Sequence, residues 1–167
     1  LFRRYYRTEK GARTIDKLLL RLPVFGVLVL KSSIARVTRT LATLLSSGVA
    51  ILESMAIVAR IAGNKVIEEA FITARSRISE GKSMSEPLEE SGIFPPMVVQ
   101  MVQVGESTGA LDSMLNKIAD FYEEDVDNLV TNLTSLLEPA IMIFLGIVLG
   151  ALLVAMYLPI FKLGQVV

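Results

Sequence analysis

Two clusters of polar residues in this chain have types and spacing that could support chemistry. The first is the acidic run Glu123-Glu124-Asp125 with Asp127, whose carboxylates are the kind of ligand that divalent cations prefer. The glycine-containing spacing of an EF-hand is missing, and neighbouring residues on a helix point in divergent directions. We therefore interpret the run as the solvated face of a helix and predict no metal site there.

The second cluster is the turn Gly105-Glu106-Ser107-Thr108-Gly109. A glycine-rich turn before a helix can bind phosphate through its backbone N–H groups. This turn lacks the lysine of a P-loop and no strand precedes it, so we do not expect it to bind a nucleotide. Its simpler role is helix punctuation, in which Gly105 ends one helix and Ser107 or Thr108 caps the next.

Histidine and cysteine are both absent from the 167 residues. The missing imidazole removes the commonest general base and the commonest transition-metal ligand. The missing thiols exclude disulfides and thiolate metal sites. We therefore predict no catalytic residue, no metal and no cofactor, and we expect that the chain is not an enzyme.

The helix that must position both clusters leads into an apolar segment, Pro139 to Leu158. These twenty residues carry no charge, and at about 1.5 Å of rise per residue they cover roughly 30 Å, the thickness of a bilayer's hydrocarbon core. Since backbone groups in lipid must be satisfied within the segment, we predict one transmembrane helix that stops at Pro159. Gly146 and Gly150 form a GxxxG pair, a candidate face for packing against another membrane helix.

Upstream of this span, apolar residues recur every three or four positions from Leu111 to Leu136. No helix breaker lies between Gly109 and Pro139, so we predict one long helix that enters the membrane with at most a kink at Pro139. Some fifty residues of helix extend roughly 75 Å. Such a helix would connect the cytoplasmic end of the chain stiffly to the bilayer.

The other segments also favour helices, so the predicted fold is all-α: a cytoplasmic antiparallel helical bundle followed by a long helix that continues into one transmembrane helix. The expected bundle helices run from Ser32 to Ser46-Ser47-Gly48, from about Val49 to Ala62, from Lys65 to Glu80, and from Met97 to Val104. A capping box, Ser83 with Glu86, predicts a short helix between the last two. The apolar run Val24 to Leu30 is too short to span, and two placements stay open for it, the membrane surface or the bundle interior.

The net charge is zero, but its distribution along the chain is uneven. Residues 1–60 carry eleven Lys and Arg against three acids, and residues 61–138 carry five against fourteen. No nucleic-acid motif accompanies the basic start, so we interpret it as the cytoplasmic flank of a membrane segment. The predicted domains are a basic juxtamembrane segment after a missing upstream span (1–30), a cytoplasmic helical bundle (31–138), a transmembrane helix (139–158) and a short periplasmic tail (159–167).

Six motifs in order resemble the C-terminal half of the platform proteins of type IV pilus and type II secretion machines, the PilC/GspF family. They are LLSSGVAILESM (44–55), Gly63-Asn64, GKSMSEPL (81–88), FPP (94–96), VGESTGAL (104–111) and LEPAIMIFLG (137–146). The resemblance implies a multi-pass protein of the bacterial inner membrane with two related cytoplasmic domains. Residues 1–138 would belong to the second of these and lie in the cytoplasm.

The function that this resemblance implies is a non-enzymatic platform of type IV pilus assembly, which couples a cytoplasmic hexameric ATPase to insertion or extraction of pilin subunits. The type II secretion platform is the first alternative, and a transporter or channel subunit is the alternative from a different class. The implied partners are the assembly or retraction ATPase, pilins, other inner-membrane pilus assembly proteins, the lipid bilayer and a second copy of the chain in a dimer, but no nucleic acid. The candidate positioning or partner-contact residues are Gly105, Glu106, Thr108, Gly109, Leu111, Glu123 and Glu124.

Overall fold

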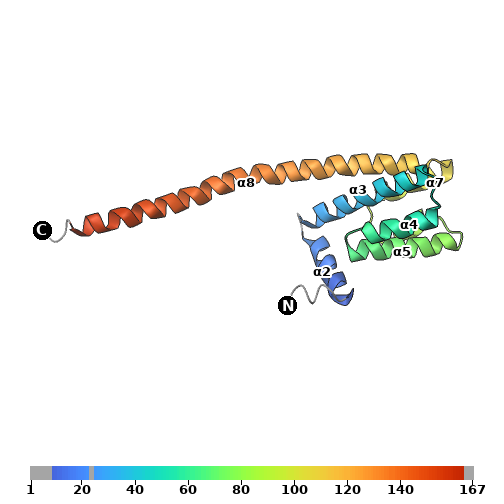
Figure 1. Ribbon diagram of the computed structural model, residues 1–167, viewed down its shortest axis with the longest axis horizontal. Coiled ribbons are helices and arrows are strands. Elements are labelled where there is room, and N and C mark those ends of the chain that lie inside the picture. The colour runs from blue at the N-terminus through green and yellow to red at the C-terminus, as the bar shows by residue number, and fades with distance from the viewer. Residues whose placement is uncertain (1–8, 23–24, 164–167) are drawn as a thin grey trace. The chain divides into compact units, whose positions relative to one another are not determined.

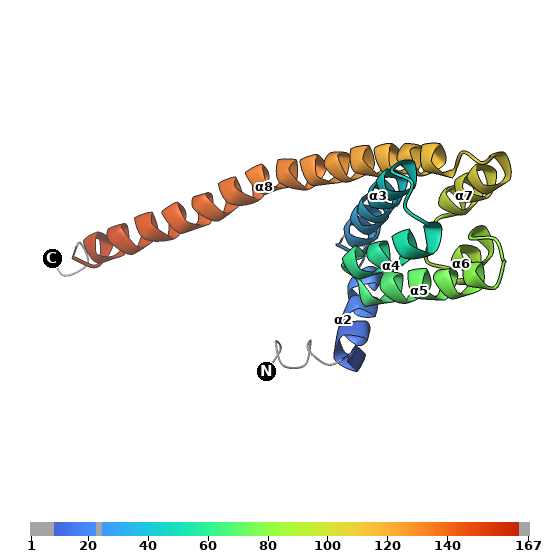
Figure 2. The same cartoon turned by 45° about the vertical axis from the view of Figure 1, so that its right-hand side comes forward.

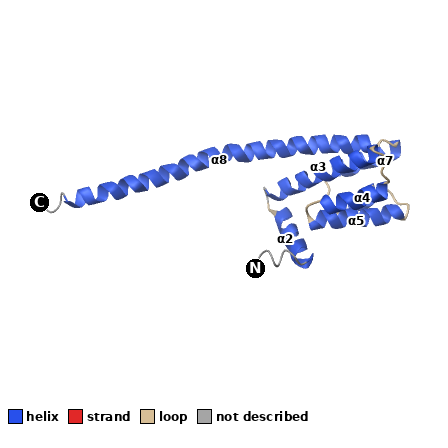
Figure 3. Ribbon diagram, viewed as in Figure 1, coloured by secondary structure: helices blue, strands red, loops and turns tan. Residues whose placement is uncertain are grey.

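The computed structural model describes residues 9–22 and 25–163, and every regular element in these ranges is a helix (Figures 1 and 3). The helices are α2 (Glu9–Arg21), α3 (Phe25–Ser46), α4 (Ile51–Ile61), α5 (Lys65–Ser79), α6 (Ser85–Glu90), α7 (Pro96–Thr108) and α8 (Leu111–Leu163). The predicted all-α fold is confirmed. The chain divides into two units, Leu1–Val126 and Asp127–Val167, and α8 contributes to both.

One hydrophobic core holds the first unit together. Ile34, Val37 and Leu41 are fully buried and recur on one face of α3, the face that the sequence period predicted. Every helix from α3 to α8 adds at least one buried side chain to the same cluster, including Met55, Ile67, Leu88, Val102 and Ile118. Burying one such side chain stabilises a fold by about 1.5–3 kcal/mol. In Figures 1 and 2, α3 runs beside the first part of α8, and α4 runs beside α5.

The predicted C-terminal end of α3 and both predicted ends of α4 and α5 agree with the structure to within about two residues. α3 stops at Ser46, and Gly48 takes a left-handed φ of 81°, a conformation that favours glycine. Gly63 separates α4 from α5 in the same way, and it also leaves room for Arg36, whose Nη2 would lie 2.9 Å from an added Cβ. Asn64 then caps α5 by accepting the backbone N–H of Val66.

The beginning of α3 differs from the prediction. The helix starts at Phe25 rather than Ser32, so residues 25–30 of the apolar run form its first turns, while Val24 lies outside the described residues. Phe25 is 60% exposed and Val27 is 40% exposed. Phe25 and Val27 therefore do not pack into the bundle interior.

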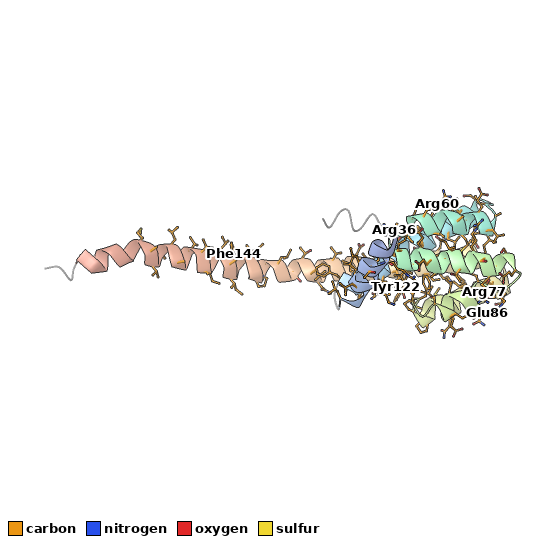
Figure 4. The ribbon with its side chains drawn as sticks, turned by 90° about the horizontal axis from the view of Figure 1, so that it is seen from below. Arg36, Arg60, Arg77, Glu86, Tyr122 and Phe144 are labelled. Atoms are coloured by element: carbon orange, nitrogen blue, oxygen red, sulfur yellow. The ribbon has the colours of Figure 1, made fainter. Side chains whose placement is uncertain are left out.

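In the second unit, α8 continues through Pro139, as predicted, and also through Pro159, which we expected to stop it. A proline removes one i→i−4 hydrogen bond, and the remaining bonds of a long apolar helix can carry it past such a gap. The apolar side chains of this stretch are exposed, with Phe144 at 66% (Figure 4). Within the described residues, α8 is the one unbroken helix long and apolar enough to cross a membrane. Its most apolar window has a mean hydropathy of 2.6, and the bent pair α2–α3 would qualify only as a broken span.

Candidate functional site

The joint between α7 and α8 is built from the turn that the sequence singled out. Gly109 has a left-handed φ of 71°, and its N–H donates to the carbonyl oxygen of Gly105. The N–H of Ala110 donates to the same oxygen at 3.0 Å, after which α8 begins at Leu111. Gly109, rather than Gly105, is therefore the glycine that ends α7, and it fixes the direction in which α8 leaves.

Gly105 has a different role from the predicted helix terminator. It is buried inside α7, where an added Cβ would lie 2.9 Å from the Cα of Leu111 and 3.2 Å from the Cβ of Met114. The contact with Leu111 is backbone, which cannot move aside without moving α8. Gly105 is thus the point at which α7 and α8 touch, and the prediction that it ends the helix is wrong.

Glu106 connects the joint to the short helix α6. Its carboxylate accepts the hydroxyl of Ser83 at 2.5 Å and the backbone N–H of Met84 at 2.6 Å, with the N–H of Ser85 at 3.3 Å. A carboxylate at a helix start satisfies free N–H groups and suits the helix dipole. The segments GKSMSEPL and VGESTGAL, which are 21 to 23 residues apart at these bonds, therefore meet at one carboxylate.

The predicted capping box of Ser83 with Glu86 is wrong, because the carboxylate at the start of α6 belongs to Glu106. Glu86 is exposed (Figure 4), and Ser83 is not the N-cap, because α6 begins two residues after it. Ser83 instead accepts the N–H of Ser85 at 3.1 Å and donates to Glu106. A carboxylate from another helix has replaced the local one.

Ser107 and Thr108 also differ from the predicted caps of α8. Their hydroxyls donate to the carbonyl oxygen of Val104, at 3.0 Å and 2.7 Å. Both residues therefore belong to the last turn of α7 and close it from within. Thr108 is exposed there, and no described contact gives it a further role.

A second contact fixes the first turns of α8 against α3. Arg39 of α3 donates to Asn116 at 3.0 Å, to Asp120 at 2.5 Å and to both carboxylate oxygens of Glu123, at 3.0 Å and 2.7 Å. The three acceptors recur at i, i+4 and i+7, so they share one face of α8. Two turns nearer the start of α3, Lys31 donates to Asp125 at 2.6 Å.

The arginine perturbs the groups around it. The hydrogen bonds that it donates lower the pKa of Glu123, and the same bonds to Glu123 and Asp120 raise the pKa of Arg39 above its already high value. Burial raises the pKa of Tyr122 on the neighbouring position, with a contribution from Asp125. The Glu123 side chain remains 49% exposed, so water screens the pair and each contact contributes about 1 kcal/mol or less.

The acidic run is thus only partly the solvated face that we predicted. Glu123 and Asp125 are paired with α3, whereas Glu124 and Asp127 are exposed. In the part of the chain that the structure describes, no group of three or more Asp or Glu residues is arranged to hold a metal ion. What the site offers is mechanical: two contacts that set the direction and register of α8.

Sequence reasoning missed Arg39, Asn116 and Ser83 as parts of this site. The available signal was weak: Arg39 is one of two arginines in α3, and Asn116, Asp120 and Glu123 share a helical face. The packing candidates Gly146 and Gly150 are exposed, with nothing within 4 Å of an added Cβ. Their packing against another membrane helix stays a prediction.

Comparison with known proteins identifies the family. The model of "Type II secretion system (T2SS), protein F" matches residues 37–159, which include α4 to α7, most of α8 and the C-terminal part of α3 from Val37 onward. The chain belongs to this family. Among PilC/GspF relatives, it is 52% identical over 159 residues to the type IV pilus assembly protein PilC of Myxococcus xanthus, covering 95% of the chain and 38% of that protein.

Two relatives from Pseudomonas aeruginosa represent both branches of the family. The chain is 45% identical over 161 residues to the type IV pilus assembly protein PilC, with 96% of the chain and 43% of the relative covered. It is 39% identical over 149 residues to the type II secretion system protein F, covering 89% of the chain and 37% of the relative. The chain therefore spans about two fifths of the length of the relatives it matches.

Proposed function

We propose that the chain is the second cytoplasmic domain and final span of a type IV pilus assembly platform in the bacterial inner membrane. In this role it would couple a cytoplasmic hexameric ATPase to the insertion or extraction of pilins, without catalysis of its own. The observation that carries the proposal is the continuity of α8. The helix that Gly105 and Arg39 hold at one end contains the apolar stretch at the other.

The pilus system is favoured over secretion by the degree of similarity. The PilC proteins of Myxococcus xanthus and Pseudomonas aeruginosa share 52% and 45% identity with the chain, against 39% for the secretion protein F. The equivalent platform of a type II secretion system is the second candidate, because the matching family model carries that description. A transporter or channel is not favoured, since 139–158 holds no Asp, Glu, Lys, Arg or His to line a path.

The proposed topology places residues 31–138 in the cytoplasm, 139–158 in the membrane and 159–167 in the periplasm, with 1–30 as a juxtamembrane segment. These 167 residues contain no cysteine, so single cysteines can replace Lys117 and Lys162 in the whole protein once any cysteine elsewhere in it has been changed to serine. A membrane-impermeant thiol reagent should label position 162 in cells with an opened outer membrane. Position 117 should react only after the inner membrane is broken, and labelling of both positions from one side would contradict the topology.

The coupling role can be tested at the exposed part of the acidic run. Glu124 is exposed and has no ion pair among the described residues, so charge reversal there leaves the packing of α8 on α3 intact. We expect Glu124→Lys to reduce recruitment of the ATPase to membranes and to reduce the number of pili. Lys117→Glu, a reversal at another exposed position of α8, is the matched control. Unchanged recruitment and pilus number in Glu124→Lys would remove this face from the mechanism.

A further inference from the structure

The corner between α2 and α3 exposes an unusual group of large apolar side chains. Leu18 is 65% exposed, Leu22 43%, Phe25 60% and Val27 40%. Leu18 and Leu22 are one turn apart, and the carbonyl oxygen of Leu22 accepts the N–H of Gly26 at 2.9 Å, which keeps Leu22 close to Phe25. We refer to these four side chains as the elbow surface. All four are absent from the core cluster of the unit.

The exposure of the elbow surface does not come from a loose helix end. The corner turns through 108°, and an added Cβ on Gly26 would lie 2.3 Å from the carbonyl oxygen of Leu20, so the two backbones touch. On the inner side of α2, Asp16 is buried and accepts the N–H of Lys65 at 2.7 Å. Arg13 pairs with Glu69 at 3.0 Å. These contacts hold α2 against α5 and leave its apolar side facing outward.

Positive charge surrounds this corner in the sequence. Residues 13–52 contain six Lys and Arg but a single acid, Asp16. That acid is buried, whereas Lys17 is exposed next to Leu18. Arg13, Lys31 and Arg39 pair with carboxylates of other helices, so the outer side of the corner combines its large apolar groups with the exposed cation Lys17 and has no accessible carboxylate from residues 13–52.

We propose that the elbow surface lies in the boundary between headgroups and acyl chains of an anionic bilayer. Leu and Phe on one side with Lys and Arg around them is the composition of elements that lie in a membrane interface. The cores of protein–protein interfaces are instead depleted in Lys. α8 of the same molecule is long and apolar enough to cross a bilayer, so a lipid surface is expected near the chain. The proposal rests on the membrane location of α8 but not on a role in pilus assembly.

The absence of tryptophan from the chain gives a direct test. In the full chain reconstituted into vesicles of phosphatidylcholine and phosphatidylglycerol, Leu18→Trp and Phe25→Trp each place one reporter on the elbow surface. Ile72→Trp, on α5 and 52% exposed, is the control in the same unit. Phe144→Trp is the reference for a residue in the bilayer. Lipids brominated near the headgroup should quench the two elbow reporters about threefold or more above the Ile72 control.

The charge part of the proposal is tested by adding Lys17→Glu to Leu18→Trp. Quenching should fall in the anionic vesicles and change little in vesicles of phosphatidylcholine alone, because the lost attraction is electrostatic. Elbow reporters that stay unquenched while Phe144→Trp is quenched would overturn the proposal. A blue-shifted but unquenched emission would do the same and assign the surface to a protein partner or a second copy. An unquenched Phe144→Trp would overturn the span itself, whereas lost piliation with normal quenching would count only against the proposed function.

Discussion

The two parts of α8 show how one helix can be specified in two different ways. Its first part, up to Val126, buries Leu115, Ile118 and Tyr122 and pairs its charged side with Arg39. The buried and paired residues of this part each contact a defined neighbour in the first unit. In the second part, the apolar side chains that the structure describes between 141 and 156 are exposed, including Ile147 at 66% and Val154 at 60%.

The difference between these parts follows from what each must match. The first part has an amphipathic pattern, because only one side meets protein and the other meets water. The second part has no polar side from Pro139 to Leu158, so its requirement is length and apolarity, which a bilayer satisfies without any particular neighbour. The contacts that fix the register of α8 against α3 therefore belong to its first part.

Gly105→Leu is expected to disturb the packing of the first part of α8 more than any other change discussed below. The added side chain would meet the backbone of Leu111 and force α7 and α8 apart. Overpacking of this kind costs about 1–3 kcal/mol, and more where backbone must move. In detergent micelles, hydrogen–deuterium exchange should increase in peptides from α7 and from residues 111–126, while peptides from 141–156 stay protected.

Gly146→Leu is the matched control, because it makes the same glycine-to-leucine change within a helix, in the apolar part of α8, but meets nothing within 4 Å. Exchange in the first unit should be unchanged in this variant. If Gly105→Leu left exchange and pilus number as in the wild type, the joint would not be what sets the direction of α8.

Much of the fold was predictable from the sequence because local rules decide it. Gly48 and Gly63 end helices through a conformation that other residues avoid, and the buried face of α3 follows its apolar period. The apolar stretch of α8 was predictable because composition alone defines it. The continuation of α8 past Pro159 was not predictable from local preference, since a single proline weakens a long helix less than that preference suggests.

For the joint between α7 and α8, the sequence singled out the right residues but not the role of each. Gly105 and Gly109 are both glycines in one turn, and only the approach of Leu111 shows which one serves packing and which one ends the helix. Similarly, Ser83 and Glu86 satisfy the capping-box pattern, but Glu106 comes from another helix and takes over the capping role. Contacts between segments far apart in sequence leave no trace in local spacing.

The smallest effect is expected at the contact between α3 and α8, where Arg39→Met removes the guanidinium but keeps the length of the side chain. Arg39 lowers the pKa of Glu123 in the folded protein below the ordinary value of 4.5. The stabilising contribution is therefore complete above that value and is lost as pH falls through the folded-state pKa. Arg39→Met should lower the stability of the first unit by roughly 1 kcal/mol near neutral pH and flatten its decline in acid, as measured by urea unfolding in nonionic micelles.

Arg60→Met, at an exposed arginine without an ion pair among the described residues, should keep the wild-type pH dependence (Figure 4). An equal acid decline in Arg39→Met and the wild type would show that Glu123 does not couple α8 to α3.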